Sequence, residues 1–190
     1  MKNENFDKEF ISRTIKIVEK LFDAAKREEY EVTFLLNCLL GLIVTTNEDL
    51  EKKESDFFDK RINSEGISDW IPNKITQLSF KDGYKTISNK LKDVNLTTIT
   101  EDFVINDFKV FVNKDLHNLS LKKLIRKIRN GIAHKNIEAV NDLEHWTGVR
   151  IWNNKDNMKD FEIEFTIGEL KLFSTEVARN YLTEFHKDDR

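Results

Sequence analysis

The segment from Glu31 to Thr46 is the feature that most restricts how this chain can fold. It is apolar almost all round a helical wheel, which is typical of a helix surrounded by other elements rather than of one lying on a surface. Its most continuous apolar part, Phe34 to Val44, is much shorter than the roughly 20 residues that a membrane-spanning helix needs. The sequence therefore predicts a central, buried helix and no association with a membrane.

Two longer segments have apolar residues at helical spacing and predict amphipathic helices around the central one. The first covers residues 5–27. The second covers residues 167–186. Thr166 directly before it and Glu169 in its first turn have the spacing of a capping box. A stripe of leucine and isoleucine predicts a further helix over residues 121–132.

The apolar pattern changes from helical to alternating near the C-terminus. Residues 149–152 and 161–165 alternate between apolar and polar side chains around a polar turn at residues 153–157, which predicts a β-hairpin. Residues 103–112 fit either a helix or a strand, because they are rich in β-branched side chains. Residues 60–92 fit short helices and loops.

The predicted fold class is mainly α: a helical bundle with a small C-terminal β-hairpin before the last helix. The 190 residues suffice for one ordinary core, so residues 1–190 are expected to form a single domain. The single cysteine, Cys38, excludes an intramolecular disulfide and a cysteine-based zinc cluster. No histidine spacing typical of a metal site, glycine-rich phosphate loop or secretory signal is present. We therefore expect a cytoplasmic protein without metal or cofactor.

The distribution of charge points to one basic segment. The formal net charge of −3 argues against a general nucleic-acid coat protein. Leu116 to Ile137, however, holds no acidic residue in a chain that has 34 of them, so a phosphate backbone would most readily lie there. The residues predicted to bind RNA are Lys122, Lys123, Arg126, Lys127 and Lys135. A solvated helix face is an equally good explanation of these side chains.

The same segment contains Arg129-Asn130-Gly131-Ile132-Ala133-His134, which combines three groups suited to phosphate chemistry. Arginine offers a permanent charge and a planar donor fork that matches phosphate oxygens. Histidine exchanges a proton near neutral pH, and asparagine is able to hold a ribose hydroxyl or the imidazole itself. Arg129, Asn130 and His134 together predict a metal-independent transesterification in which the 2′-hydroxyl of RNA is the nucleophile.

Helix geometry predicts that this site is shared between two subunits. Asn130 and His134 are i,i+4 neighbours, whereas Arg129 lies about 140° from His134 on the helical wheel. One straight helix does not easily aim Arg129 and His134 at one phosphate. A second copy related by a two-fold axis would place Arg129 of one subunit beside His134 of the other, so we expect a homodimer.

The motif resembles the signature of the HEPN superfamily: an arginine, a polar residue directly after it, and a histidine after four intervening residues. Residues 34–42, the motif helix, the tryptophan-containing segment 148–152 and a final helix are similar to a plasmid- and phage-defence-associated subfamily. The likeness covers residues 8–185. It implies a helical bundle, a homodimer and a metal-independent endoribonuclease, with Arg129 and His134 catalytic and Asn130 supporting them. It is also compatible with a toxin or defence effector controlled by an antitoxin or other regulatory partner.

Several alternatives stay open. The chain could be a non-catalytic HEPN module that binds RNA or a nucleotide or regulates a partner enzyme by dimerising, or a purely structural interaction protein. Gly131 is unfavourable inside a helix, which indicates close packing, a ligand or a local helix end. Asn37 lies in the apolar helix, where a buried amide needs partners, and it either supports the active site or forms an interhelical bond. Trp146, Trp152 and the neighbouring Arg150 are able to stack on a base, and the alternative is that a tryptophan packs the hairpin on the bundle.

Overall fold

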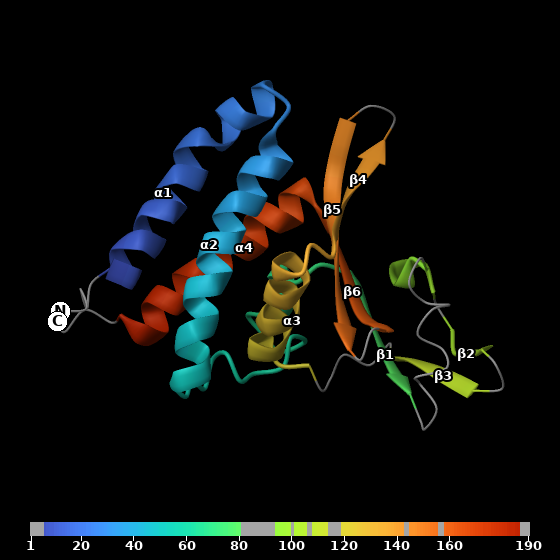
Figure 1. The fold of residues 1–190 in the computed structure, drawn as a ribbon. Helices are drawn as coiled ribbons and strands as arrows, with labels where there is room; N and C mark the ends of the chain where they lie inside the picture. Colours follow the sequence, from blue (N-terminus) through green and yellow to red (C-terminus); the bar gives the residue numbers. More distant parts are fainter. Residues whose placement is uncertain are drawn as a thin grey trace.

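The computed structural model describes residues 6–80, 94–99, 101–105, 108–113, 119–142, 145–155 and 158–186. Within these residues, a bundle of four α-helices stands beside one six-stranded antiparallel sheet (Figure 1). The helices are α1 (Phe6–Arg27), α2 (Glu31–Lys52), α3 (Leu121–Ala133) and α4 (Ile167–Phe185), with the short 3₁₀ helices η1 (Ser68–Trp70) and η4 (Leu96–Thr98). The strands are β1 (Lys74–Phe80), β2 (Phe103–Ile105), β3 (Phe108–Asn113), β4 (Ile137–Asp142), β5 (His145–Lys155) and β6 (Met158–Thr166).

α2 is the central helix of the bundle, as predicted, and packs against α1, α3 and α4 (Figure 1). The expectation that it is buried all round is wrong for the single chain. One side is buried, but Asn37, Leu40 and Val44 are exposed on another side. The apolar composition of α2 therefore reflects a buried side and an open apolar strip. No helix among the described residues is long and apolar enough to cross a membrane.

α1 and α4 confirm the two predicted amphipathic helices, and α4 begins at the predicted capping box. The Thr166 hydroxyl accepts a hydrogen bond from the Glu169 amide (3.2 Å), and the Glu169 carboxylate accepts one from the Thr166 amide (2.8 Å). Further along α4, the Phe173 ring packs against Phe165 of β6 and Trp70 of η1, with centroid distances of 5.3 and 5.8 Å. α4 thus continues directly from the sheet and shares one core with it.

The predicted hairpin is confirmed as β5 and β6, but it is part of a much larger sheet and not a small appendage. The strand order is β2-β3-β1-β6-β5-β4, and neighbouring strands are antiparallel. Of residues 103–112, those that are described, 103–105 and 108–112, fall on strands, and residues 74–80, expected to be loop or short helix, form β1. These strands gain their hydrogen bonds from partners that are distant in sequence, which local periodicity does not reveal.

Parts of two predicted loops lie outside the described residues. Of the expected turn at 153–157, residues 153–155 continue β5 and residues 156 and 157 are not described. Of the segment 60–92, residues 81–92 are likewise outside the described ranges. The hairpin strands are consequently longer than the alternating pattern indicated.

A β-bulge in β6 decides which side chains face the helices. Asn153 pairs with Phe161 and Asn154 pairs with Lys159, so Asp160 is the extra residue. Asp160 therefore turns toward α3, where its Oδ2 accepts a hydrogen bond from Lys127 Nζ (2.7 Å). The apolar side chains that alternate along β5 and β6 face the bundle, and the charged side chains between them face away from it.

Candidate functional site

The candidate site lies at the C-terminal end of α3, a helix that is firmly held in the core. The Ser120 hydroxyl caps its first turn by accepting a hydrogen bond from the Lys123 amide (3.4 Å). Its predicted apolar stripe is confirmed, because four side chains of it are fully buried: Leu121, Leu124, Ile125 and Ile128. α3 packs through this stripe against α2 and β5, which leaves its polar side outward.

Gly131 allows α3 to approach β5 closely. A Cβ atom at this position would lie 2.6 Å from Ile151 Cγ2 and 2.6 Å from the carbonyl oxygen of Trp152. A side chain does not fit there without moving the strand, because one of the two contacts is backbone. Close packing therefore explains this glycine, and α3 ends only two residues later.

The helix ends in a Schellman motif that fixes the position of His134. The Lys135 amide donates to the carbonyl of Ile132 (3.0 Å), and the Asn136 amide donates to the carbonyl of Gly131 (2.8 Å). Lys135 adopts the left-handed conformation that this motif requires, with φ of 58°. His134 is therefore the cap of α3, and only two residues separate it from β4.

The three motif side chains are accessible from solvent. Arg129 and Asn130 are half-buried and His134 is exposed. Arg129 Nη1 donates a hydrogen bond to Asn130 Oδ1 (3.1 Å), so these two side chains are already joined in one chain. Within the described residues the His134 imidazole is bonded to neither of them, and no group of three or more His, Cys, Asp or Glu side chains is placed to hold a metal ion.

Four of the basic residues predicted to bind RNA remain accessible. Lys123 and Lys135 are exposed, and Lys122 is half-buried. Arg126 lies 3.4 Å from Glu51, with both side chains about half exposed. An exposed pair of this kind contributes little free energy, so a phosphate group competes readily for Arg126.

Lys127 is placed differently from the other basic residues. Its ammonium donates to Asp160 (2.7 Å) and lies 5.3 Å from the centroid of the Phe161 ring. Its side chain is only 19% exposed. A phosphate would have to displace the Asp160 carboxylate to bind Lys127, whereas Lys123 and Lys135 impose no such cost.

Asn37 is not the buried amide that the sequence suggested. It is exposed on α2, in the strip that contains Leu40 and Val44. An exposed amide needs no hydrogen-bond partner within the chain, because water satisfies it. The interhelical bond expected for Asn37 is therefore unnecessary, and its supporting role in catalysis stays a prediction.

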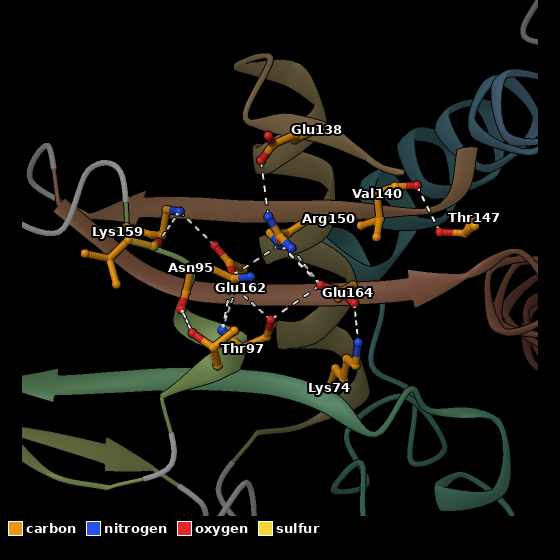
Figure 2. Close-up of polar contacts among 12 residues, drawn as sticks. Lys74, Asn95, Thr97, Glu138, Val140, Thr147, Arg150, Lys159, Glu162 and Glu164 are labelled. Atoms are coloured by element: carbon orange, nitrogen blue, oxygen red, sulfur yellow. Dashed lines mark hydrogen bonds and ion pairs between the residues drawn. The ribbon is translucent and has the colours of Figure 1, made fainter. Parts of the chain in front are cut away.

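A second polar group, which the sequence did not indicate, lies on the sheet face turned away from α3 (Figure 2). Glu162 is fully buried there and accepts hydrogen bonds from Lys159 (2.7 Å) and from the Thr97 amide (3.2 Å). Glu164 accepts one from Arg150 (2.9 Å). Alternating glutamates alone predict a solvated face. Their burial depends on η4 and β1, which come from distant parts of the chain.

The pKa of Glu164 lies below its ordinary value. Burial alone would raise the pKa of this carboxyl, but hydrogen bonds and charges from Lys74 and Arg150 favour its ionised form more strongly. The carboxylate therefore holds the guanidinium of Arg150 at a fixed place on the sheet. The Arg150 guanidinium, whose side chain is 18% exposed, also contacts Glu138 (3.3 Å).

Comparison with known proteins identifies a relationship along nearly the whole chain. A family model described as HEPN pEK499 p136 matches residues 1–188. No curated protein and no solved structure matches the chain. The matched range includes α3, its motif and the entire sheet.

Proposed function

The chain belongs to the HEPN pEK499 p136 family, and on that premise we propose that it is a metal-independent endoribonuclease with Arg129, Asn130 and His134 in its active site. One observation carries this proposal. The three residues fall within six positions at the solvent-accessible C-terminal end of a basic helix, where Arg129 is already bonded to Asn130. The fold thus presents a cation, an amide and an imidazole to a ligand that approaches from solvent.

In the proposed reaction, the ribose 2′-hydroxyl attacks the adjacent phosphorus, and the bond from phosphorus to the 5′-oxygen breaks. His134 takes the proton from the hydroxyl or donates one to the leaving oxygen. Arg129 stabilises the negative charge that develops on the phosphoryl oxygens, and Asn130 positions the Arg129 guanidinium or a ribose hydroxyl. The products are a 2′,3′-cyclic phosphate and a 5′-hydroxyl end, and DNA is not cut because it lacks the nucleophile.

We propose that Lys122, Lys123, Arg126 and Lys135 bind the RNA backbone on either side of the reacting phosphate. They belong to the same helix or to its terminal turn, and they remain accessible. Binding that depends on such contacts weakens as the salt concentration rises, because each contact releases counterions from the RNA.

The active site is proposed to form between two subunits. α2 exposes Leu40 and Val44, which are 36% and 38% exposed, beside Asn37. Neighbouring exposed apolar side chains are typical of a protein interface. Because α2 packs directly against α3, a two-fold partner that covered this strip would lie next to the motif. The partner would then supply the second half of each site.

The decisive experiment is cleavage of a labelled structured RNA in the presence of EDTA. His134→Ala and Arg129→Ala should each lower the cleavage rate by about 10²- to 10⁴-fold, the range typical of a general acid–base group or a charge-stabilising donor. His145→Ala and Arg13→Ala are matched controls, because these side chains are exposed and contact Glu29 and Glu9, which do not belong to α3 or its motif. Sensitivity to EDTA, or full activity in His134→Ala, would rule out the mechanism.

A non-catalytic module is the second candidate, and one observation favours it. In the described chain, the His134 imidazole is bonded to neither Arg129 nor Asn130, so a monomer does not orient it as a base. Such a module would bind RNA or a nucleotide, or regulate a partner enzyme by dimerising. RNA binding without turnover, unchanged in His134→Ala, would support this candidate. A purely structural protein would be indifferent to substitution of both motif residues.

We further propose that the ribonuclease is a growth-arresting toxin or defence effector under the control of a partner. The support is the resemblance of the motif and its flanking segments to defence-associated HEPN proteins. Induced expression should stop growth of a bacterial host, and His134→Ala should remove the effect while the protein accumulates to the same level. Equal toxicity of both forms would contradict this role.

A further inference from the structure

The outer face of the sheet contains a polar hollow close to the end of the motif helix. It has a volume of about 430 Å³ and lies between the start of η4 and the β4–β5 part of the sheet. The residues that line it are Val94, Asn95, Ile137, Glu138, Arg150, Trp152 and Lys159. The hollow thus combines one large aromatic ring with amide, carboxylate, ammonium and guanidinium groups.

Arg150 is held rigidly on the sheet beside the hollow (Figure 2). Its Nε and Nη2 donate to Glu164 (3.3 and 2.9 Å), and its Nη1 donates to Glu138 (3.3 Å). A guanidinium has five N–H donors, so these three contacts leave two donors for a ligand. Because the side chain is already ordered, binding an anion costs little rotamer entropy.

Trp152 provides a rigid aromatic wall. The Lys159 ammonium lies 4.7 Å from the centroid of the indole and occupies one face of the ring. Lys159 is itself only 6% exposed and donates to Glu162 (2.7 Å) and to the carbonyl of Val94 (2.8 Å). Trp152 still lines the hollow, so a planar ligand in the hollow would stack on the part of the indole that Lys159 does not cover.

The backbone places this hollow beside the candidate active site. The Trp152 amide donates to the carbonyl of Asn136 (3.1 Å), two residues after His134. Covalent geometry then limits the distance between the Cα atoms of His134 and Trp152 to about 15 Å. β4 begins opposite Ile151, so among the described strands β5 forms the sheet edge from Trp152 onward. An RNA strand would cross this edge within a few nucleotides of the cleaved bond.

We propose that the hollow binds one nucleotide of the RNA, with the base on Trp152 and the phosphate at the two remaining donors of Arg150. Glu138 and Glu164 each accept from Arg150 without using all of its donors, so one N–H on Nη1 and one on Nη2 are left for a phosphodiester oxygen. Aromatic stacking accepts any base, and the neighbouring amide and carboxylate groups add a preference among bases. The biological meaning of this subsite rests on the proposed ribonuclease function, but nucleotide binding is measurable without cleavage.

The test is titration of the four nucleoside 5′-monophosphates, one at a time, with binding measured by calorimetry. Trp152→Ala should weaken binding by about tenfold or more, because it removes the stacking surface, and Trp152→Phe should retain most of the affinity. Trp146→Ala is the matched control, since Trp146 is on the same strand, is 49% exposed and lies outside the hollow. His134→Ala should bind the nucleotide as the wild type does.

An NMR measurement on the wild type avoids dependence on the folding of the variants. The indole N–H resonance of Trp152 should shift on nucleotide addition, while those of Trp70 and Trp146 should not. The subsite is excluded if no monophosphate binds at millimolar concentration, if Trp152→Ala binds like the wild type, or if His134→Ala loses binding. Trp152-dependent binding by a protein that cuts no RNA would uphold the subsite and reject the ribonuclease. RNA cleavage without Trp152-dependent nucleotide binding would uphold the ribonuclease and reject the subsite.

Discussion

Lys135 has the least favourable backbone conformation in the candidate site. Its φ of 58° lies in the left-handed region, which costs a residue with a Cβ atom about 1–2 kcal/mol. The Schellman motif nevertheless requires this conformation for His134 to cap α3 and for the chain to turn into β4. Position 135 thus has a lysine although glycine would adopt this backbone conformation at a lower free-energy cost.

Lys135→Gly should consequently stabilise the protein. We expect the free energy of unfolding to rise by about 0.5–1 kcal/mol, since relief of the left-handed conformation exceeds the entropy that glycine gains in the unfolded chain. Urea unfolding measures the change. Lys135→Ala is the control, because it removes the same charge and keeps the unfavourable conformation. An equal gain in both variants would attribute the effect to charge and contradict the backbone explanation.

That Arg129, Asn130 and His134 lie close to one another along the chain, at the end of one basic helix, was predictable because all three fall within six consecutive residues. The errors concern residues whose surroundings come from elsewhere in the chain. Asn37 was expected to be buried, yet α2 has an open side that its composition does not reveal. The alternating pattern of residues 161–165 gave no sign that Glu162 is fully buried, with contacts to η4 and Lys159. Residue type and spacing do not specify which distant segment covers a side chain.

At the scale of elements, the contact between α3 and β5 depends on the absence of a side chain at Gly131. Gly131→Ala should lower the free energy of unfolding by about 1–3 kcal/mol through overpacking. The higher helix propensity of alanine offsets about 1 kcal/mol of this loss. The matched control is Gly168→Ala in α4, where a Cβ would meet nothing within 4 Å. Thermal or urea unfolding should show destabilisation in the first variant and little change or a gain in the second. Equal stability of the two variants would contradict the close packing.

A polar contact between α2 and α4 should make stability depend on pH. Burial alone would raise the pKa of Asp49, but hydrogen bonds from the Tyr181 hydroxyl and Lys53 outweigh it, so the pKa of this carboxyl lies below its ordinary value of 3.8. The folded chain therefore binds this proton less readily than the unfolded chain. The resulting stabilisation is complete above a pH of about 4 and is lost as the pH falls through the lowered pKa.

Asp49→Asn tests this dependence. The stability difference between wild type and variant should be largest near neutral pH and should shrink as the pH falls below about 4. Urea unfolding at a series of pH values measures it, and Asp59→Asn, at an exposed carboxylate, is the control. A difference that stayed constant between neutral and acidic pH would mean that the charge of Asp49 is not responsible.

The helices could be predicted more completely than the strands. α1, α3 and α4 follow from apolar periodicity and, for α4, from a capping box within four residues. β1, β2 and β3 pair with segments far away in sequence, so their short apolar runs had no local signal that separated them from helices or loops. The bulge at Asp160 is a further non-local feature, because only the pairing with β5 reveals the extra residue.

At the scale of the whole molecule, a shared active site makes a prediction that a site within one subunit does not. Arg129→Ala and His134→Ala should each be inactive alone. When the two are unfolded together and refolded in equal amounts, half of the dimers contain one subunit of each kind and one intact site. About one quarter of the wild-type activity should return, as random pairing of two-fold dimers requires. Cleavage of labelled RNA before and after mixing measures the recovery.

Two outcomes would contradict the shared site. A mixture that stays inactive although mixed dimers form would place Arg129 and His134 of one active site in the same subunit. Activity of a monomeric protein would do the same. Val44→Glu provides the corresponding control, since a charge in the exposed strip of α2 should prevent dimerisation and activity while leaving the fold, measured by circular dichroism, unchanged.

Alternate side chains of β5 face opposite sides of the sheet and therefore have different roles. Val149 and Ile151 face the bundle, where the volume of each is limited by close packing with α3 and the core. Arg150 and Trp152 face outward, where substitution leaves that packing intact. Under the proposed nucleotide subsite, substitutions at Arg150 and Trp152 would alter the recognition of RNA, whereas substitutions at Val149 and Ile151 would disturb the packing that positions the motif.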